Sequence, residues 1–245
     1  MAEPVSLPDG NAGVTRCDIL AAGRELFSQL RYSEVSGRQI CNRAGVTRSA
    51  LQRHFGSKLG VFMAVFEGLQ HEVSIRMTEC INEDQTPWER ARAGIAVLLD
   101  ACTEPGYQTV VLREGPAAIG WERWRELDTE YYAPLVRALV EMLAPAELGE
   151  CGSTMLAATV RGTLTELSFE IAQSSDQATA RQEALAVADR LLTGLRATPA
   201  AQQPIRIGIG QLRASAGSYL DRAAAGETIE VLRRGRVVAR LQSST

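Results

Sequence analysis

The sequence predicts a mainly α-helical chain that ends in a small module of strands and helix. From residue 15 to residue 196, apolar residues recur at three- and four-residue steps, which is the spacing of one helix face. No segment in that range alternates as a strand does. After a Pro- and Gln-containing stretch at 197–204, the segment 205–209 alternates Ile with Arg or Gly, and a helical segment and two β-rich runs follow. We therefore expect a linker at 197–204 and a β-α-β-β module at 205–245.

Capping residues divide the first 60 residues into four expected helices. The first is amphipathic and covers 16–30, and a short second helix ends at Gly45, since glycine commonly follows the last helical residue. A third helix is expected over 48–55 and a long fourth one after it. The candidate N-caps of the four helices are Thr15, Ser36, Thr47 and Ser57. Further helical periodicity covers 88–101, 118–143, 151–173 and 178–196.

Length and composition bound the class of protein. A chain of 245 residues holds one or two domains with a sizeable core. No apolar run approaches the ~20 residues of a membrane-spanning helix, and residues 1–14 lack the basic and apolar regions of a signal peptide. We expect residues 1–14 to form a disordered arm, and we expect a cytoplasmic protein without a membrane partner.

The five cysteines, at positions 17, 41, 80, 102 and 151, form no CxxC pair. Because the chain has only two histidines, a zinc site of mixed Cys and His ligands is not expected. Most of these cysteines fall in apolar helical stretches, so buried, reduced thiols are expected. The sequence predicts no metal and no cofactor.

Charge is divided unevenly along the chain, whose formal net charge is −3. Residues 15–80 hold nine basic and six acidic groups, residues 81–203 hold ten basic and eighteen acidic, and residues 204–245 hold seven basic and three acidic. Within Ser36–Lys58 there are five basic side chains and no acid. Such asymmetry indicates a polyanionic partner for the two basic regions, with a solvated helical face as the alternative.

Two short helices joined by a Gly-containing turn, the second of them basic, are typical of a helix-turn-helix. In that motif the N-terminal residues of the second helix reach base edges in the major groove. Here those residues are Thr47, Arg48 and Ser49, with Gln52 one turn on. Lys58, the only lysine, is placed to bind a phosphate together with free N–H groups at the start of the fourth helix. Ordinary helical packing is the alternative for the turn taken alone.

The segment 15–68, "TRCDILAAGRELFSQLRYSEVSGRQICNRAGVTRSALQRHFGSKLGVFMAVFEG", resembles the N-terminal domain of TetR-type transcriptional regulators. The resemblance implies a helix-turn-helix domain at 15–60 and a helical ligand-binding and dimerisation domain at 61–196. The residues that carry it are Ile19, Leu20, Ala21, Ala22, Leu26, Phe27, Ile40, Ala44, Gly45, Val46, Leu51, His54, Phe55, Ser57 and Lys58. The predicted DNA-binding set is Ser36, Arg38, Thr47, Arg48, Ser49, Gln52, Arg53, His54 and Lys58.

The resemblance also implies roles and partners. His54 contacts a phosphate by analogy, with local packing beside Phe55 as the alternative. Three positions depart from the usual pattern: Arg31 replaces Gly, Gln52 replaces Tyr, and Leu59 replaces an acidic residue. Gln52 lacks an aromatic phosphate contact, but its amide can donate to phosphate or adenine.

TetR-type regulators pair through their last two helices, which implies a homodimer on near-palindromic double-stranded DNA. Here these helices are 151–173 and 178–196, where small residues permit close approach. Those small residues are Ala157, Ala158, Gly162, Ala184, Ala186 and Ala188. A small-molecule effector of unknown identity is implied for the helical domain. The candidate pocket residues are Trp88, Trp121, Trp124, Tyr131 and Phe169, with core or dimer-interface packing as the alternative.

The segment 205–241, "IRIGIGQLRASAGSYLDRAAAGETIEVLRRGRVVARL", resembles the DNA-binding half of Phd/YefM-type antitoxins. That resemblance implies a module that dimerises and contacts DNA. Three uses stay open for it: a second DNA contact, an extra dimer clamp, or a protein-binding module. Its candidate DNA-contacting residues are Arg206, Arg213, Arg233, Arg234 and Arg236.

The sequence thus predicts a ligand-released, dimeric transcriptional repressor. The alternative is an antitoxin-like interaction protein in which the TetR-like part mainly supplies dimerisation. No Ser/His/Asp set, phosphate-binding Gly loop or paired carboxylate motif is recognisable, so an enzyme is not expected.

Overall fold

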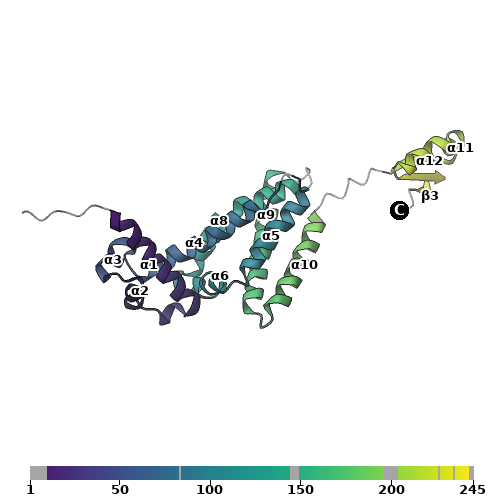
Figure 1. Ribbon diagram of the computed structural model, residues 1–245. Coiled ribbons are helices and arrows are strands. Elements are labelled where there is room, and N and C mark those ends of the chain that lie inside the picture. Colours follow the sequence, from purple (N-terminus) through teal and green to yellow (C-terminus); the bar gives the residue numbers. More distant parts are fainter. Residues whose placement is uncertain are drawn as a thin grey trace, which may run out of the picture. The chain divides into compact units, whose positions relative to one another are not determined.

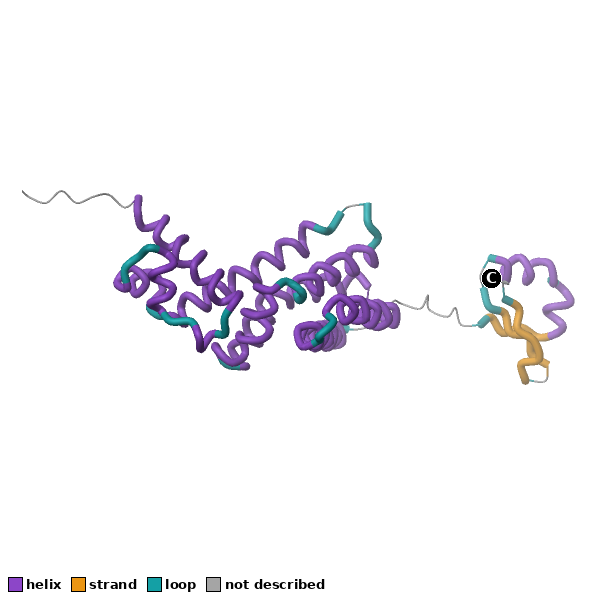
Figure 2. Tube along the Cα trace, turned by 60° about the horizontal axis from the view of Figure 1, so that its bottom comes forward, coloured by secondary structure: helices purple, strands orange, loops and turns teal. Residues whose placement is uncertain are grey.

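The chain forms two compact units, Met1–Leu195 and Arg196–Thr245 (Figure 1). The computed structural model describes residues 10–82, 84–143, 149–195, 204–225, 227–233 and 235–242. Among these residues the first unit is entirely helical, and the strands belong to the second (Figure 2). The predicted linker at 197–204 lies, except for its last residue, outside the described residues.

The first unit is a succession of helices joined by short turns. Their bounds are α1 Gly10–Gln29, η1 Tyr32–Glu34, α2 Gly37–Ala44, α3 Arg48–Phe55, α4 Lys58–Glu79, α5 Pro87–Ala101, α6 Pro105–Tyr107, η2 Gln108–Glu114, α7 Gly115–Ile119, α8 Trp121–Leu143, α9 Glu150–Gln173 and α10 Gln177–Leu195. The four helices predicted from periodicity after residue 87 are confirmed as α5, α8, α9 and α10, to within a few residues at each end.

Two expectations for the N-terminal region are wrong. Helix α1 already begins at Gly10, so Thr15 lies inside the helix and is not its N-cap. Residues 10–14 therefore belong to α1 and not to a disordered arm, while residues 1–9 of the predicted arm lie outside the described residues. Thr15 is a polar residue shortly before the apolar run, so capping preferences placed the start of the helix there. Helix α1 instead continues through Thr15 toward the N-terminus.

The segment between Pro105 and Ile119 holds three helical pieces that periodicity did not reveal. Pro105 and Pro116 stand in the first turns of α6 and α7, where a missing N–H costs little. Between them, η2 is a π-helix of seven residues. Its wider turn shifts side chains away from the 3.6-residue repeat, which explains why the sequence pattern was not legible there.

Helix α4 runs through the core of the whole first unit. Its N-terminal half packs with α1, and its C-terminal half packs with α5 and α8. The residues it buries are Val61, Phe62, Val65, Phe66, Leu69, Gln70, Val73 and Met77. Because the core is one continuous cluster from Ile19 to Leu192, the first 60 residues do not have a core of their own.

The second unit is a three-stranded sheet with two helices. Its elements are β1 Ile205–Gly208, α11 Ile209–Ala214, α12 Ala216–Ala224, β2 Ile229–Arg233 and β3 Arg236–Leu241. The strand order is β1-β2-β3, with β1 parallel to β2 and β2 antiparallel to β3. Ile207, Ala223, Ile229 and Val231 are its buried apolar residues.

The predicted β-α-β-β order is therefore right in its strands and too simple in its helix. Ser215 separates α11 from α12, so the single expected helix is two. Ile209, expected in the first strand, instead begins α11 because Gln211 Oε1 accepts a hydrogen bond from the Gly208 N–H at 2.9 Å. None of the helices in the described ranges combines the length and the apolar character that a membrane-spanning segment needs.

The contact between α3 and α4 makes a testable prediction. A Cβ on Gly60 would collide with the backbone carbonyl oxygen of Phe55, whereas a Cβ on Gly68 of the same helix meets open space. We expect Gly60→Ala to lower the unfolding free energy by about 1–3 kcal/mol, because backbone atoms cannot move aside. Gly68→Ala should raise it by about 0.5–1 kcal/mol through helix propensity. Urea unfolding followed by circular dichroism measures both; equal effects would contradict the close approach of the two helices.

Candidate nucleic-acid interface

Helices α2 and α3 are each fixed by a side chain at the N-terminus, as predicted. The Ser36 hydroxyl accepts from the Gln39 N–H at 3.3 Å, and the Thr47 hydroxyl accepts from the Ala50 N–H at 3.2 Å. Between the helices, Gly45 has a φ of 65°, a left-handed conformation that glycine adopts without steric cost. The turn from Gly45 to Thr47 is therefore set by local hydrogen bonds.

The orientation of α3 follows from its two apolar residues. Leu51 is buried in the core and Phe55 packs against it, with the Arg16 guanidinium 5.2 Å from the centre of the Phe55 ring. The opposite side of the helix faces solvent. Its exposed residues are Thr47, Arg48, Ser49, Gln52 and Arg53, which are five of the nine predicted site residues.

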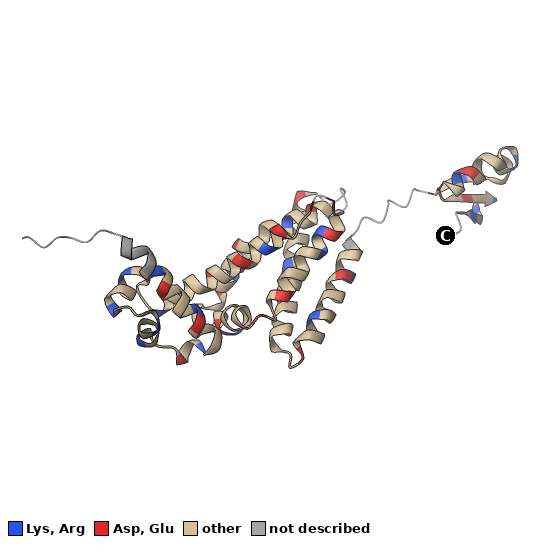
Figure 3. Cartoon of the chain, in the orientation of Figure 1, with Lys and Arg blue, Asp and Glu red and all other residues tan. Residues whose placement is uncertain are grey.

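Only some of the basic residues here are neutralised. Arg43 on α2 forms an ion pair with Glu25 on α1. Arg38, Arg48 and Arg53 are exposed and form no ion pair with any described residue. Figure 3 shows that α2 and α3 carry basic and no acidic side chains. The positive charge of three guanidinium groups is thus available at the surface.

A shallow hollow brings several predicted residues together. It lies between the N-termini of α2 and α4 and the exposed side of α3, and it is lined by Ser36, Arg38, Arg48, Gln52 and Lys58, among others. The N-terminal ends of helices present free N–H groups and a partial positive charge. The hollow therefore has the donors and the charge that bind a phosphate group. Of the predicted set, Thr47, Ser49, Arg53 and His54 do not line it.

Lys58 has a role that the sequence did not reveal. Its ammonium donates to the carbonyl oxygens of Tyr32 and Val35, both at 2.9 Å, and lies 3.9 Å from the centre of the Tyr32 ring. Two of its three donors are thus used inside the protein, where they hold η1 against α4. A phosphate contact by Lys58 stays a prediction, with one N–H left to make it.

His54 is half-buried, and its Nε2 atom is shielded from solvent without a hydrogen-bond partner in the described part of the chain. A phosphate contact through Nε2 requires the imidazole to turn outward. The role that resemblance implies for His54 therefore stays a prediction, and its present placement beside Phe55 fits the packing alternative.

Comparison with known proteins decides the family. Residues 19–65 match the profile of "Bacterial regulatory proteins, tetR family", and residues 88–195 match the profile of "Tetracyclin repressor-like, C-terminal domain". The two matches together span more than half of the chain. The chain belongs to the TetR family. This family consists of DNA-binding transcriptional regulators and not of enzymes. Neither match extends beyond residue 195, so the Phd/YefM-like character of the second unit stays a prediction.

Two helix-turn-helix transcriptional regulators and one TetR-family structure agree with this assignment. The chain is 35% identical over 91 residues to the HTH-type transcriptional regulator SrpR of Pseudomonas putida, covering 37% of this chain and 41% of SrpR. It is 34% identical over 91 residues to the regulator TtgW of Pseudomonas putida, covering 37% of this chain and 65% of TtgW. These matches thus span less than two thirds of either relative. A TetR-family regulator from Pectobacterium atrosepticum is similar in structure, with a TM-score of 0.65 and 29% identity over 79% of this chain and all of that one.

The TetR-type DNA-binding part is tied to the helices that follow it. Glu114, the last residue of η2, accepts a hydrogen bond from the Tyr32 N–H at 2.8 Å. The neighbouring Arg113 donates to the carbonyl oxygen of Ala172 on α9, through Nη2 at 2.5 Å and Nε at 3.1 Å. Two adjacent residues of the π-helix therefore contact the DNA-binding part and α9. Sequence reasoning missed both, since no local signal marks a contact 82 residues away.

The five aromatic residues predicted for an effector pocket do not form one pocket. Trp124 is buried and lines an enclosed cavity, whereas the other four are not among the residues that line it. Trp121 is 49% exposed, and its ring stacks on Trp124 at 5.2 Å with Phe169 beside the pair. Trp88 and Tyr131 are only partly buried at the edge of the core. The cavity's polar residues lay outside the prediction because it considered aromatics alone.

Two further sets of predicted residues are scattered. In the second unit Arg206 pairs with Glu230 at 3.2 Å, while Arg213, Arg233 and Arg236 are exposed; Arg234 lies outside the described residues.

Of the cysteines, Cys41 and Cys102 are buried, and burial raises the pKa of the Cys102 thiol to about 12. Contrary to expectation, Cys17 and Cys151 are exposed. No group of metal-ligating residues occurs among the residues that the structure describes.

The role of Lys58 can be tested on the protein without DNA. Lys58→Met removes two charge-assisted hydrogen bonds to backbone carbonyls, and we expect it to lower the unfolding free energy by about 1–3 kcal/mol in urea unfolding. Arg53→Met is the control, since this exposed side chain has no ion pair in the described structure and should change stability little. An unchanged stability of Lys58→Met would contradict the internal role.

Proposed function

We propose that this chain is a dimeric transcriptional repressor that binds a near-palindromic operator and is released by a small molecule. The observation that carries the proposal is the exposed side of α3, where Arg48, Ser49 and Gln52 face solvent. The surrounding segment 36–58 contains no acidic residue. Arg pairs with guanine through two hydrogen bonds, and Ser and Gln hydrogen-bond other base edges. An α-helix with this surface fits the major groove.

The outward side of α9 and α10 supports a dimer. Met155, Val187 and Leu191 on these two helices are 66%, 43% and 49% exposed, and a partner helix would cover them. Gly162 on α9 has open space around its Cα, so a partner helix can approach closely. Of the small residues predicted to face a partner, Ala184 and Ala188 are instead buried within the unit. A two-fold axis beside these helices would place two copies of α3 on one duplex.

The proposal leaves three uses open for the second unit, which forms the tail of the chain. Arg213, Arg233 and Arg236 are exposed and suit a second DNA contact, which we rank first. Val237 and Val238 on β3 are 47% and 55% exposed, which suits an additional clamp between two copies. Binding of another protein is the third use.

Replacing Arg48 tests the interface. After an operator is selected from random duplexes, we expect Arg48→Ala to lose roughly 1–3 kcal/mol of operator affinity and to relax the preference at one base pair. Competition binding against single-base operator variants measures this preference.

Arg43→Ala is the matched control for that experiment. Because Arg43 already pairs with Glu25, its loss should leave the base preference unchanged. If Arg48→Ala keeps the parent preference at every position, α3 is not the reading helix.

Deleting residues 198–245 separates the uses of the tail. If the tail binds DNA, the slope of log K against log salt becomes less steep by ~0.9 for each phosphate that the tail neutralises in the full chain. If the tail is a dimer clamp, the slope is unchanged while the dimer dissociates at higher protein concentration, as sedimentation measures. Unchanged slope and unchanged dimerisation would favour the protein-binding use.

A further inference from the structure

The core of the first unit contains an inner cavity of about 20 Å³ among α4, α5, α8 and α9. Its lining residues are all buried or half-buried. An outer cavity of about 80 Å³ adjoins it between α4, α5 and α8, and a side cavity of about 80 Å³ lies between α5, α9 and α10. The inner cavity has room for about one water molecule. By itself it is too small for an organic ligand.

Four side chains are shared between these cavities: Val136 lines the inner and outer ones, Ile95 lines the outer and side ones, and Leu164 and Met77 are the other two. Leu164 on α9 lines all three cavities, and Met77 on α4 lines both the inner and the outer one. Methionine is unbranched and adapts its shape readily. With Leu164 and Met77 turned aside, the combined space is of the size that takes a single aromatic ring, since a cavity of ~150 Å³ binds benzene. Ile81 and Met142, which are 43% and 41% exposed, line the outer cavity and give it a mouth.

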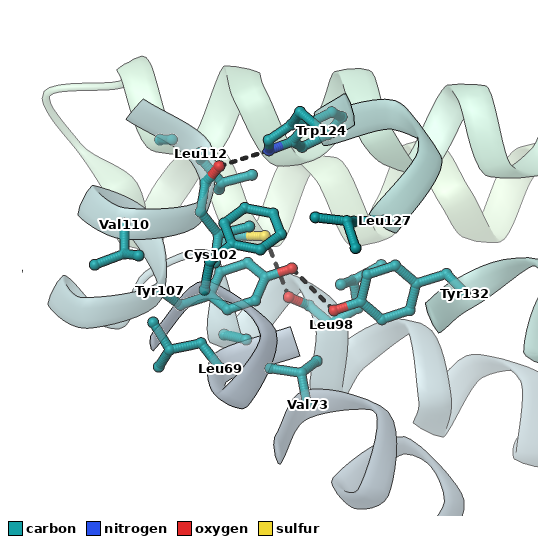
Figure 4. Packing of buried hydrophobic residues seen from close by; sticks show 14 of the residues in the cluster. Leu69, Val73, Leu98, Cys102, Tyr107, Val110, Leu112, Trp124, Leu127 and Tyr132 are labelled. Carbon is teal, nitrogen blue, oxygen red and sulfur yellow. Dashed lines mark hydrogen bonds between the residues drawn. The ribbon is translucent and has the colours of Figure 1, made fainter. Parts of the chain in front are cut away.

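The inner end of this space is polar. The hydroxyl groups of Tyr107 and Tyr132 lie 3.0 Å apart and point toward one another (Figure 4). Both donate to Oε1 of Gln70, at 2.9 and 2.6 Å. Gln70 is completely buried, and its Nε2 has no hydrogen-bond partner within the described residues. The cluster therefore has unused lone pairs on the tyrosine oxygens and an unused donor on the amide.

The charges of the inner cavity cancel. Asp128 on α8 and Arg161 on α9 line it and form an ion pair at 3.0 Å, with side chains only 10% and 16% exposed. A charged ligand would form an ion pair with either Asp128 or Arg161 and leave the other charge buried without a partner. An unpaired buried charge is energetically costly. Burial raises the pKa of Asp128 even with Arg161 beside it. Arg90 lines only the outer cavity, where its Nε donates to the carbonyl oxygen of Gln85.

We propose that Met77 and Leu164 partition one binding chamber, and that the chamber takes a compact, uncharged, mainly apolar molecule with one hydroxyl group, such as a small phenol. The ring lies among Trp124, Leu98 and the two partitioning side chains, and the hydroxyl reaches the Tyr107 and Tyr132 oxygens. Because both tyrosine hydroxyls already donate to Gln70, the ligand hydroxyl acts as the donor to their oxygens. The inference rests on the proposed function, in which the effector binds among the helices that follow the helix-turn-helix.

The first experiment compares three probes of similar shape on the full chain without DNA. They are p-cresol, toluene, which lacks the hydroxyl, and p-toluate, which is an anion. By titration calorimetry we expect p-cresol to bind about tenfold tighter than toluene and at least tenfold tighter than p-toluate, as one hydrogen bond and one uncompensated charge suggest. Equal binding of p-cresol and toluene, tighter binding of p-toluate, or no binding of p-cresol would overturn the proposal.

Two variants of adjacent residues locate the hydroxyl. Tyr132→Phe should bring the p-cresol to toluene ratio close to one, while Tyr131→Phe, which does not line the three cavities, should leave it unchanged. The ratio is insensitive to a general loss of stability, because both probes need the same fold. A ratio that Tyr132→Phe leaves intact places the hydroxyl elsewhere and contradicts the assignment.

A second pair of variants tests the partition. Leu164→Ala should strengthen binding of the larger 2-naphthol at least tenfold relative to the parent, and Leu167→Ala on the same helix should not. If Leu164→Ala does not fold, as circular dichroism shows, Met77→Ala serves instead. No gain in either folded variant would refute the partition. Since none of these measurements involves DNA, p-cresol binding without operator release would contradict ligand-controlled repression and leave the chamber intact.

Discussion

The burial of one long helix, α4, is the constraint on which the rest of the first unit depends. Its 22 residues extend for ~33 Å and bury side chains from Val61 beside the helix-turn-helix to Met77 at the cavities. At its start Lys58 holds the η1 turn, and near its middle Gln70 anchors two tyrosine hydroxyls. One element thus contributes buried side chains both to the packing around the helix-turn-helix and to the packing around the cavities.

Ion pairs at the surface complement that arrangement. Arg24 pairs with Glu72 and so joins α1 to α4, and Arg43 pairs with Glu25 and so joins α2 to α1. Each such exposed pair contributes little to stability. Their effect is to neutralise the charges of Arg24 and Arg43. Arg48 and Arg53 form no ion pair with any described residue and keep their charge at the surface. The positions of Glu72 and Glu25 therefore decide which arginine charges remain for a polyanionic partner.

Short-range signals allowed much of the DNA-binding part to be predicted. Ser36, Thr47 and Ser57 each accept a hydrogen bond from an N–H three residues on, and Gly45 adopts the backbone angle that its position requires. All of these interactions join residues that are close in sequence, so the type of each residue and its spacing are sufficient to recognise them. The strands of the tail were predictable for the same reason.

Most of the long helices, the caps of α2, α3 and α4 and the segregation of charge could thus be read from the sequence, because each depends on residues that are close along the chain. Other contacts could not be predicted in this way. Lys58 donates to carbonyls 23 and 26 residues away, Glu114 contacts Tyr32, and the hydroxyls of Tyr107 and Tyr132 both reach the buried amide of Gln70. Those contacts join elements whose separation along the chain carries no periodic signal. They exist because packing α4 among α1, α5 and α8 brings distant polar groups to the same place, where each must find a partner.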